Sequence, residues 1–126
     1  MDASDHDSEG GLSVLGVQFH RPNAYILTVR GVTGPGSSDV LDHAFTRATA
    51  VAQPVIVDLG ALEFGDATLL GHLLGAYQSH RAVLVGPLSA SFSRRLAVTG
   101  AASVFTVHAT LTQALNGITL PPGADT

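Results

Sequence analysis

The residues best suited to chemistry stand where an apolar run ends and a helix is expected to begin. Residues 54–59 read PVIVDL, and residues 64–77 follow as FGDATLLGHLLGAY. This order predicts a buried strand, a tight turn and a helix opened by Asp66, a residue type that caps helix N-termini well. Many α/β proteins bind their ligands at such junctions. The junction is therefore the leading candidate for a functional site.

The start of this helix has the physical properties of a phosphorylation switch. Free backbone N–H groups and the helix dipole favour a phosphate bonded to a hydroxyl at this point. A serine would be expected at position 67 in such a switch, but the sequence has Ala67 there and Thr68 one place later. Thr68 is therefore the only candidate phosphoacceptor at the first two helical positions.

The two sides of the expected helix differ in character. One sector carries five apolar residues and is predicted to be buried: Leu69, Leu70, Leu73, Leu74 and Tyr77. The opposite sector carries small or polar residues: Thr68, Gly71, His72, Gly75 and Ser79. A glycine inside a helix costs about 1 kcal/mol relative to alanine. We expect a flat face on which a partner backbone can lie. The alternatives are that a neighbouring segment of the same chain crosses the helix there, or that the glycines are incidental.

The residue types and motifs of the sequence give little support for a catalytic site or a metal site. The chain has no cysteine and no lysine, which excludes thiolate ligands, cysteine nucleophiles, Schiff bases and a Walker lysine. No Gly-x-Ser-x-Gly elbow is present, and the glycine-rich loop 31–38 is better interpreted as a connection and helix cap than as a phosphate cradle. The six histidines lack the spacing of helical ligand pairs. We expect no metal, no cofactor and no enzymatic activity.

Composition narrows the class of partner. The 126 residues are 45% hydrophobic and 13% charged, with a net charge of −4. Six scattered arginines do not build a phosphate-tracking stripe, so we expect no nucleic-acid partner. Arg94 and Arg95 are most simply the solvent face of a helix, although the pair could serve an acidic partner. No run approaches the roughly 18 apolar residues of a membrane span, and the N-terminus is acidic, so a cytoplasmic protein is expected.

The rest of the chain predicts one α/β domain over residues 12–118, with flexible tails at residues 1–11 and 119–126. Strands are expected at residues 12–19, 24–32, 55–59, 82–85 and 104–107. Helices are expected at residues 39–51, 66–80, about 91–100 and 110–116. A hairpin followed by repeated βα units predicts a mixed, mostly parallel sheet of about five strands with about four helices.

Taken together, these segments resemble the STAS family, the anti-sigma factor antagonists. The matching pieces are VIVDL, the phenylalanine of FGD, the helix start DAT with LLGHLL after it, and then VLVGPL, RRLAVTGA and VFTVHATLTQAL. The resemblance covers about residues 12–117 and depends on the order and spacing of the pieces together. It implies a STAS-like fold.

The resemblance also implies a function in partner switching. In that family the unphosphorylated antagonist docks on an anti-sigma factor that is a serine/threonine kinase of the HATPase type. Phosphorylation directly after the helix-opening acid prevents docking. The matching acid is Asp66, the usual phosphoacceptor position is Ala67, and Thr68 matches the second hydroxyl of the motif. The implied partner-binding residues are Phe64, Gly65, Asp66, Ala67, Thr68, Gly71, His72 and Gly75.

One further departure and one alternative accompany the resemblance. The loop at residues 31–34 lacks the acid that the family commonly carries there. The absence of a hydroxyl at Ala67 also keeps open a STAS-type scaffold, or a sensory or transport accessory subunit, without a phosphorylation switch. A homodimer is compatible with either function, and an enzyme is the weakest of the three classes.

Overall fold

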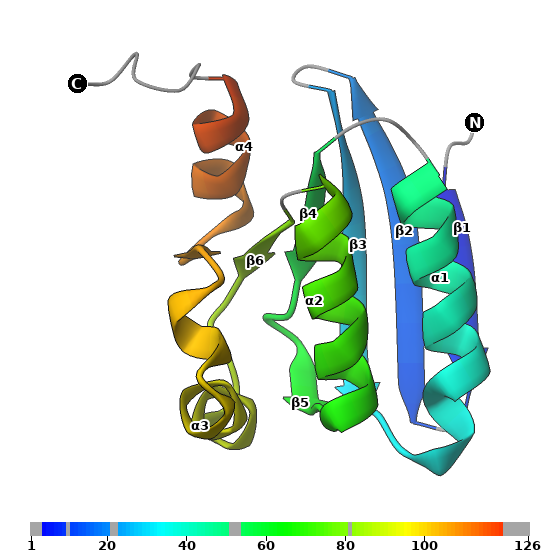
Figure 1. The fold of residues 1–126 in the computed structure, drawn as a ribbon. Helices are drawn as coiled ribbons and strands as arrows, with labels where there is room; N and C mark the ends of the chain where they lie inside the picture. The colour runs from blue at the N-terminus through cyan, green and yellow to red at the C-terminus, as the bar shows by residue number, and fades with distance from the viewer. Residues whose placement is uncertain (1–3, 10, 21–22, 51–53, 81, 120–126) are drawn as a thin grey trace.

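The computed structural model describes residues 4–9, 11–20, 23–50, 54–80 and 82–119. Its centre is a seven-stranded sheet in the order β1-β2-β3-β4-β6-β7, with β5 pairing beside β3 (Figure 1). The strands are β1 Ser4–Glu9, β2 Leu12–His20, β3 Asn23–Val32, β4 Val55–Asp58, β5 Leu62–Phe64, β6 Val83–Val85 and β7 Val107–His108. The helices are α1 Ser38–Ala50, α2 Ala67–His80, α3 Ala90–Thr99 and α4 Leu111–Thr119. Short 3-10 turns at Pro35–Ser37 and Ala101–Ser103 complete the described elements.

The predicted fold class is confirmed. Strands β1, β2 and β3 pair antiparallel, whereas β4, β5, β6 and β7 join the sheet through parallel pairings. The β2–β3 hairpin and the following βα units occur in the expected order. Strand β5 was not expected, because three residues are too few to show an alternating pattern. The last strand is shorter and later than predicted, since Ala101–Ser103 forms a 3-10 turn before it.

The prediction of a flexible tail over residues 1–11 is wrong for residues 4–9. These residues form β1, with Ser4 opposite Val17 and Glu9 opposite Leu12 in β2. An edge strand is held by backbone hydrogen bonds and commonly carries charged residues, so its low apolar content concealed it. Gly11 is an exposed turn residue before β2. Positions 1–3 and 10 lie outside the described residues, as does the C-terminal segment from residue 120 onward. Thr119 of the predicted C-terminal tail is the last residue of α4.

Helices cover the two faces of the sheet unequally. Helices α1, α2 and α3 share one core cluster with alternate residues of the strands, among them Leu27, Val57 and Leu84. Helix α4 packs on the other face, where Ala114 joins a smaller cluster with Ile56 and other strand residues. In Figure 1, α1 and α2 lie side by side across the sheet. This arrangement presents the start of α2 next to β5 and α3.

Candidate functional site

The turn before α2 is built as the sequence predicts. The Asp66 carboxylate accepts a hydrogen bond from the Leu69 N–H at 3.1 Å, and the Asp66 carbonyl accepts one from the Leu70 N–H at 3.2 Å. Asp66 is therefore the N-cap of α2. Ala67 and Thr68 follow as the first two helical residues, and both are exposed.

A residue from another loop holds this turn in place. The Asp66 N–H donates a hydrogen bond to the Thr33 hydroxyl at 2.8 Å, and the Thr33 N–H donates one to the Phe64 carbonyl at 2.9 Å. The Thr33 hydroxyl also donates to the Phe64 carbonyl at 3.4 Å. Thr33 is only 2% exposed. Sequence reasoning interpreted this loop as a connection and helix cap that lacks an acid, and it did not find the supporting role of Thr33.

Helix α3 supports the same turn from the other side. Arg95 Nε donates a hydrogen bond to the Gly65 carbonyl at 3.1 Å. Gly65 is buried, and a Cβ built on it would lie 2.6 Å from a ring carbon of Phe92 and 2.9 Å from a methyl of Leu69. A glycine is needed here because the backbone approaches these side chains closely. The turn thus joins β5, α2 and α3.

The two glycines inside α2 are open to solvent. Gly71 and Gly75 are exposed, and a Cβ built on either would meet no described atom within 4 Å other than those of its chain neighbours and the nearby backbone of its own helix. Gly75 also lines a shallow hollow between α1 and α2, whereas Gly71 does not. A Cβ at either position would therefore clash with no neighbouring segment, so close packing within the described part of the chain does not require glycine there.

The buried face of α2 is rotated relative to the prediction. Leu69, Leu70 and Leu73 are buried as expected, but Leu74 is half-buried and Tyr77 is 38% exposed. Ala76 is buried in their place. The helix turns its 72–76 side toward α1, because α1 packs beside it on the same face of the sheet. The prediction that Tyr77 is buried is therefore wrong, although its ring still contacts Phe105 at 5.7 Å between centroids.

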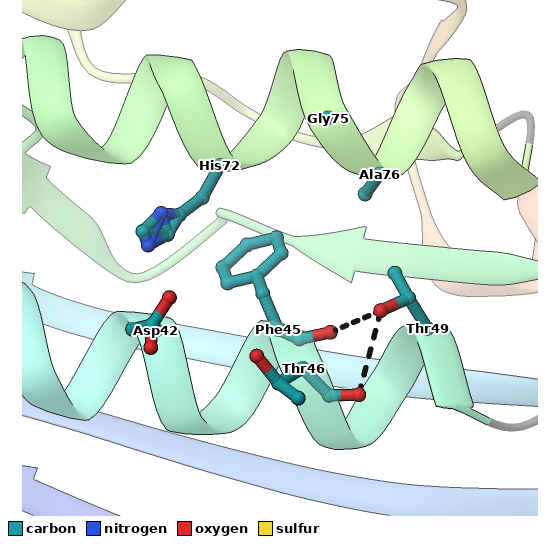
Figure 2. Close-up of a pocket in the computed structure, with 7 residues that line it drawn as sticks. All are labelled: Asp42, Phe45, Thr46, Thr49, His72, Gly75 and Ala76. Carbon is teal, nitrogen blue, oxygen red and sulfur yellow. Dashed lines mark hydrogen bonds between the residues drawn. The ribbon is translucent and has the colours of Figure 1, made fainter.

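This rotation also moves His72 off the exposed sector. His72 is half-buried and faces α1, where its ring meets the Phe45 ring edge to face with centroids 5.4 Å apart (Figure 2). The two helices leave a shallow hollow of about 200 Å³ at this seam. The hollow is lined by Asp42, Phe45, Thr46, Thr49, His72, Gly75 and Ala76. His72 was expected among the exposed residues of the helix, and the structure places it in the α1–α2 seam instead.

The environment between α1 and α2 favours the neutral form of the His72 imidazole. Its Nε2 atom is buried and has no hydrogen-bond partner among the described residues. Burial lowers the pKa of His72, and the negative charges of Asp42 and Asp66 offset only part of that effect. An uncharged imidazole avoids the cost of a buried cation, so His72 contributes to helix packing rather than to an exposed charge.

The predicted partner-binding residues therefore separate into two groups. Five are exposed at the start of α2 and along one of its sides, and we call them the α2 face: Phe64, Ala67, Thr68, Gly71 and Gly75. Three lie beneath or beside this face and shape it: Gly65, Asp66 and His72. Phe64 is 39% exposed, a large apolar side chain next to the glycine-bearing helix.

Two further observations bear on chemistry. Across the described ranges, no three side chains of histidine, cysteine, aspartate or glutamate come together as metal ligands would. None of the helices in the part of the chain that the structure describes has the length and apolar character needed to cross a bilayer.

Comparison with known proteins identifies the fold. No family model matches the chain, and no curated protein does either. Solved structures do match. An anti-sigma factor antagonist from Mycobacterium paratuberculosis superimposes with a TM-score of 0.67 at 18% identity, covering 91% of this chain and 92% of that one. An anti-sigma-factor antagonist (STAS) domain protein from Planctomyces limnophilus gives a TM-score of 0.58 at 16% identity, covering 94% and 98%.

These matches confirm the resemblance to STAS domains at the level of the fold. Both superpositions extend over more than nine-tenths of this chain, so the likeness includes the sheet and the helices rather than one motif. At 18% and 16% identity the likeness is one of fold alone. Function has to be argued from the α2 face.

Proposed function

We propose that this chain is a cytoplasmic, non-enzymatic binding module that acts as an anti-sigma factor antagonist. The α2 face docks on an anti-sigma factor of the HATPase kinase type and thereby releases a sigma factor. The observation that carries this proposal is the exposure of Gly71 and Gly75 in the middle of α2. The fold that the chain shares with solved anti-sigma factor antagonists supports it.

The glycines support docking because glycine is an unfavourable residue inside a helix. Each costs the free chain about 1 kcal/mol relative to alanine, and no described atom lies where their Cβ atoms would be. A helix without Cβ atoms on one side allows another backbone to approach closely. Phe64 at the edge of this surface adds an aromatic side chain of the kind that anchors protein interfaces.

The turn beneath the face supports docking through rigidity. Thr33 and Arg95 fix the backbone of Gly65 and Asp66 by hydrogen bonds of 2.8 and 3.1 Å, and the Asp66 carboxylate accepts a hydrogen bond from the Leu69 N–H at 3.1 Å. A surface that is already ordered loses less conformational entropy when it binds. The α2 face is therefore suited to a partner that recognises a fixed shape.

The regulation we propose differs from the usual phosphorylation switch. Ala67 has no hydroxyl, and Thr68 is the exposed hydroxyl nearest to the helix start. A phosphate on Thr68 would add a charge of about −1.5 to −2 to the docking surface and prevent close approach. We propose Thr68 as the acceptor if the switch is retained in this chain.

Isothermal titration of the purified chain with each purified kinase-type anti-sigma factor of the source organism tests the function. We expect one of them to bind, and Gly71→Arg or Gly75→Arg to abolish binding while the melting temperature stays near that of the wild type. Thr112→Arg is the matched control, because it adds the same charge to an exposed position of α4 on the other face of the sheet. Normal binding by both glycine variants would show that the α2 face is not the docking surface.

The absence of a hydroxyl at Ala67 favours one second candidate, a STAS-type scaffold or a sensory or transport accessory subunit without a switch. This candidate keeps the α2 face but replaces the kinase with another protein, or with a second copy of the chain. A stable complex that contains no kinase, found while every anti-sigma factor fails to bind, would favour it. Analytical ultracentrifugation of the chain alone separates the homodimer from the other complexes.

A further inference from the structure

Helix α3 carries a second exposed surface next to the α2 face. Arg94 is exposed, Val98 is 80% exposed, and Arg95 is half-buried between them. Together with Ser91 and Thr99 they line a shallow hollow of about 230 Å³. We call Arg94, Arg95 and Val98 the α3 patch.

The positive charge of this patch is not neutralised within the described residues. Helix α3 contains no acidic residue, and neither arginine forms an ion pair with a described carboxylate. The hydrogen bond that the Arg95 side chain makes within the described residues goes to a backbone carbonyl rather than to a carboxylate. The whole chain has a net charge of −4, so two adjacent arginines stand out against their surroundings.

The patch is continuous with the α2 face through a direct bond. Arg95 Nε donates to the carbonyl of Gly65, the residue between Phe64 and the cap Asp66. The ring of Phe92, three residues earlier in α3, packs against the same glycine. A partner that covers Phe64 and the start of α2 therefore meets α3 next.

We propose that the α3 patch binds an acidic segment of the same partner that docks on the α2 face. Its carboxylates pair with Arg94 and Arg95, and an apolar side chain among them covers Val98. This assignment rests on the proposed function. A guanidinium binds a carboxylate through two parallel N–H donors. Val98 exposes most of its apolar side chain to solvent in the free chain, so an apolar side chain of a partner can bury it.

An acidic protein segment suits the patch better than a nucleic acid. Binding along a phosphate backbone uses many basic residues, and the α3 patch offers two on a chain of net negative charge. The exposed Val98 of the patch matches an apolar side chain of a protein rather than a phosphate. Binding of a short DNA duplex by the wild-type chain, lost on Arg94→Glu, would overturn the proposal.

Charge reversal at Arg94 tests the assignment. The full chain and the purified anti-sigma factor that binds it are titrated at about 0.05 M and 0.5 M salt, conditions that differ strongly in screening. We expect Arg94→Glu to weaken binding by about tenfold or more at low salt and to reduce the salt dependence of the affinity. Val98→Ser, at a position that is 80% exposed, is expected to weaken binding several-fold at both salt concentrations.

Arg30→Glu is the matched control, because it makes the same charge change at an exposed position of β3. If Arg94→Glu and Val98→Ser bind like this control while Gly71→Arg does not bind, the α3 proposal is overturned and the α2 docking face stands. If no anti-sigma factor binds even the wild-type chain, the proposed function itself fails. The two failures are therefore distinguishable.

Discussion

The Thr33 hydroxyl accepts a hydrogen bond from the Asp66 N–H at 2.8 Å, although the two residues are 33 positions apart in the chain. This bond connects the loop after β3 to the residue that caps α2. Next to it, the Thr33 N–H donates a hydrogen bond to the Phe64 carbonyl, which holds the end of β5 against the same loop. The shape of the proposed docking surface therefore depends on a loop that contributes no exposed residue to the α2 face.

Replacement of Thr33 is expected to destabilise the protein. Thr33→Val keeps the shape of the side chain but removes the acceptor of the partly buried Asp66 N–H, which costs about 1 kcal/mol. Urea unfolding of the wild type, Thr33→Val and Thr33→Ser measures the effect, and the serine variant retains the hydroxyl. A valine variant as stable as the wild type would show that the hydrogen bond does not hold the turn.

Alanine at position 71 is expected to stabilise the free chain. The added Cβ meets open space, so Gly71→Ala should raise the free energy of unfolding by about 0.5–1 kcal/mol. Gly65→Ala is the matched comparison and should lower it, because its Cβ would lie 2.6 Å from the Phe92 ring. Thermal unfolding of both variants tests the contrast. A destabilising Gly71→Ala would point to an intramolecular contact at this face.

His72 is expected to make stability depend on pH. Its pKa in the folded chain is lowered by burial, so protonation favours the unfolded state. The stabilisation is present above the ordinary histidine pKa of about 6.5 and is lost as the pH falls from there through the lower folded-state value. Urea unfolding between about pH 7.5 and 5 should show this loss in the wild type.

The variant His72→Phe identifies the residue responsible. Phenylalanine keeps an aromatic ring against Phe45 and cannot take up a proton, so the stability of this variant should change less over the same pH range. His20→Phe, which makes the same substitution at an exposed position of β2, is the matched control. An unchanged slope in His72→Phe would assign the pH dependence to other groups.

Restoring a hydroxyl at position 67 is expected to restore a switch. Position 67 is exposed at the first turn of α2, where a serine is accessible and the helix dipole favours its phosphate. After the Ala67→Ser variant is incubated with the cognate kinase-type partner, mass spectrometry should find phosphate on the introduced serine. Titration of the phosphorylated variant should show binding at least about tenfold weaker than that of the unmodified variant. In the wild type, phosphate on Thr68 would indicate a displaced acceptor, which Thr68→Val should remove. A phosphorylated Ala67→Ser that binds as tightly as the wild type would contradict the proposed switch.

Local signals in the sequence predicted much of the fold. The cap at Asp66, the apolar run before it and the 3.6-residue spacing of α1 are patterns within a few residues, and each predicted element follows from them. Strand β1 was missed because edge pairing depends on the backbone of β2 rather than on apolar residues in Ser4–Glu9. Strand β5 was missed because it is three residues long.

The candidate site was less predictable because its supports are distant in sequence. The turn before α2 uses Thr33 from the loop after β3 and Arg95 from α3, and no spacing rule connects these positions. The spacing of apolar residues in α2 predicted which sector of the helix is apolar. It could not predict that α1 packs beside α2 and changes which side is buried. Packing of α1 against α2 rotated the helix, burying Ala76 and drawing His72 into the seam.

Hydrogen exchange on the complex with the cognate anti-sigma factor tests the central claim most directly. Amide exchange in the free and bound chain is compared for residues 62–77, which include the α2 face, and for α4 on the other side of the sheet. We predict slower exchange in residues 62–77 on binding and unchanged exchange in α4. Protection confined to α4, with none at the start of α2, would contradict the proposal that the α2 face is the docking surface.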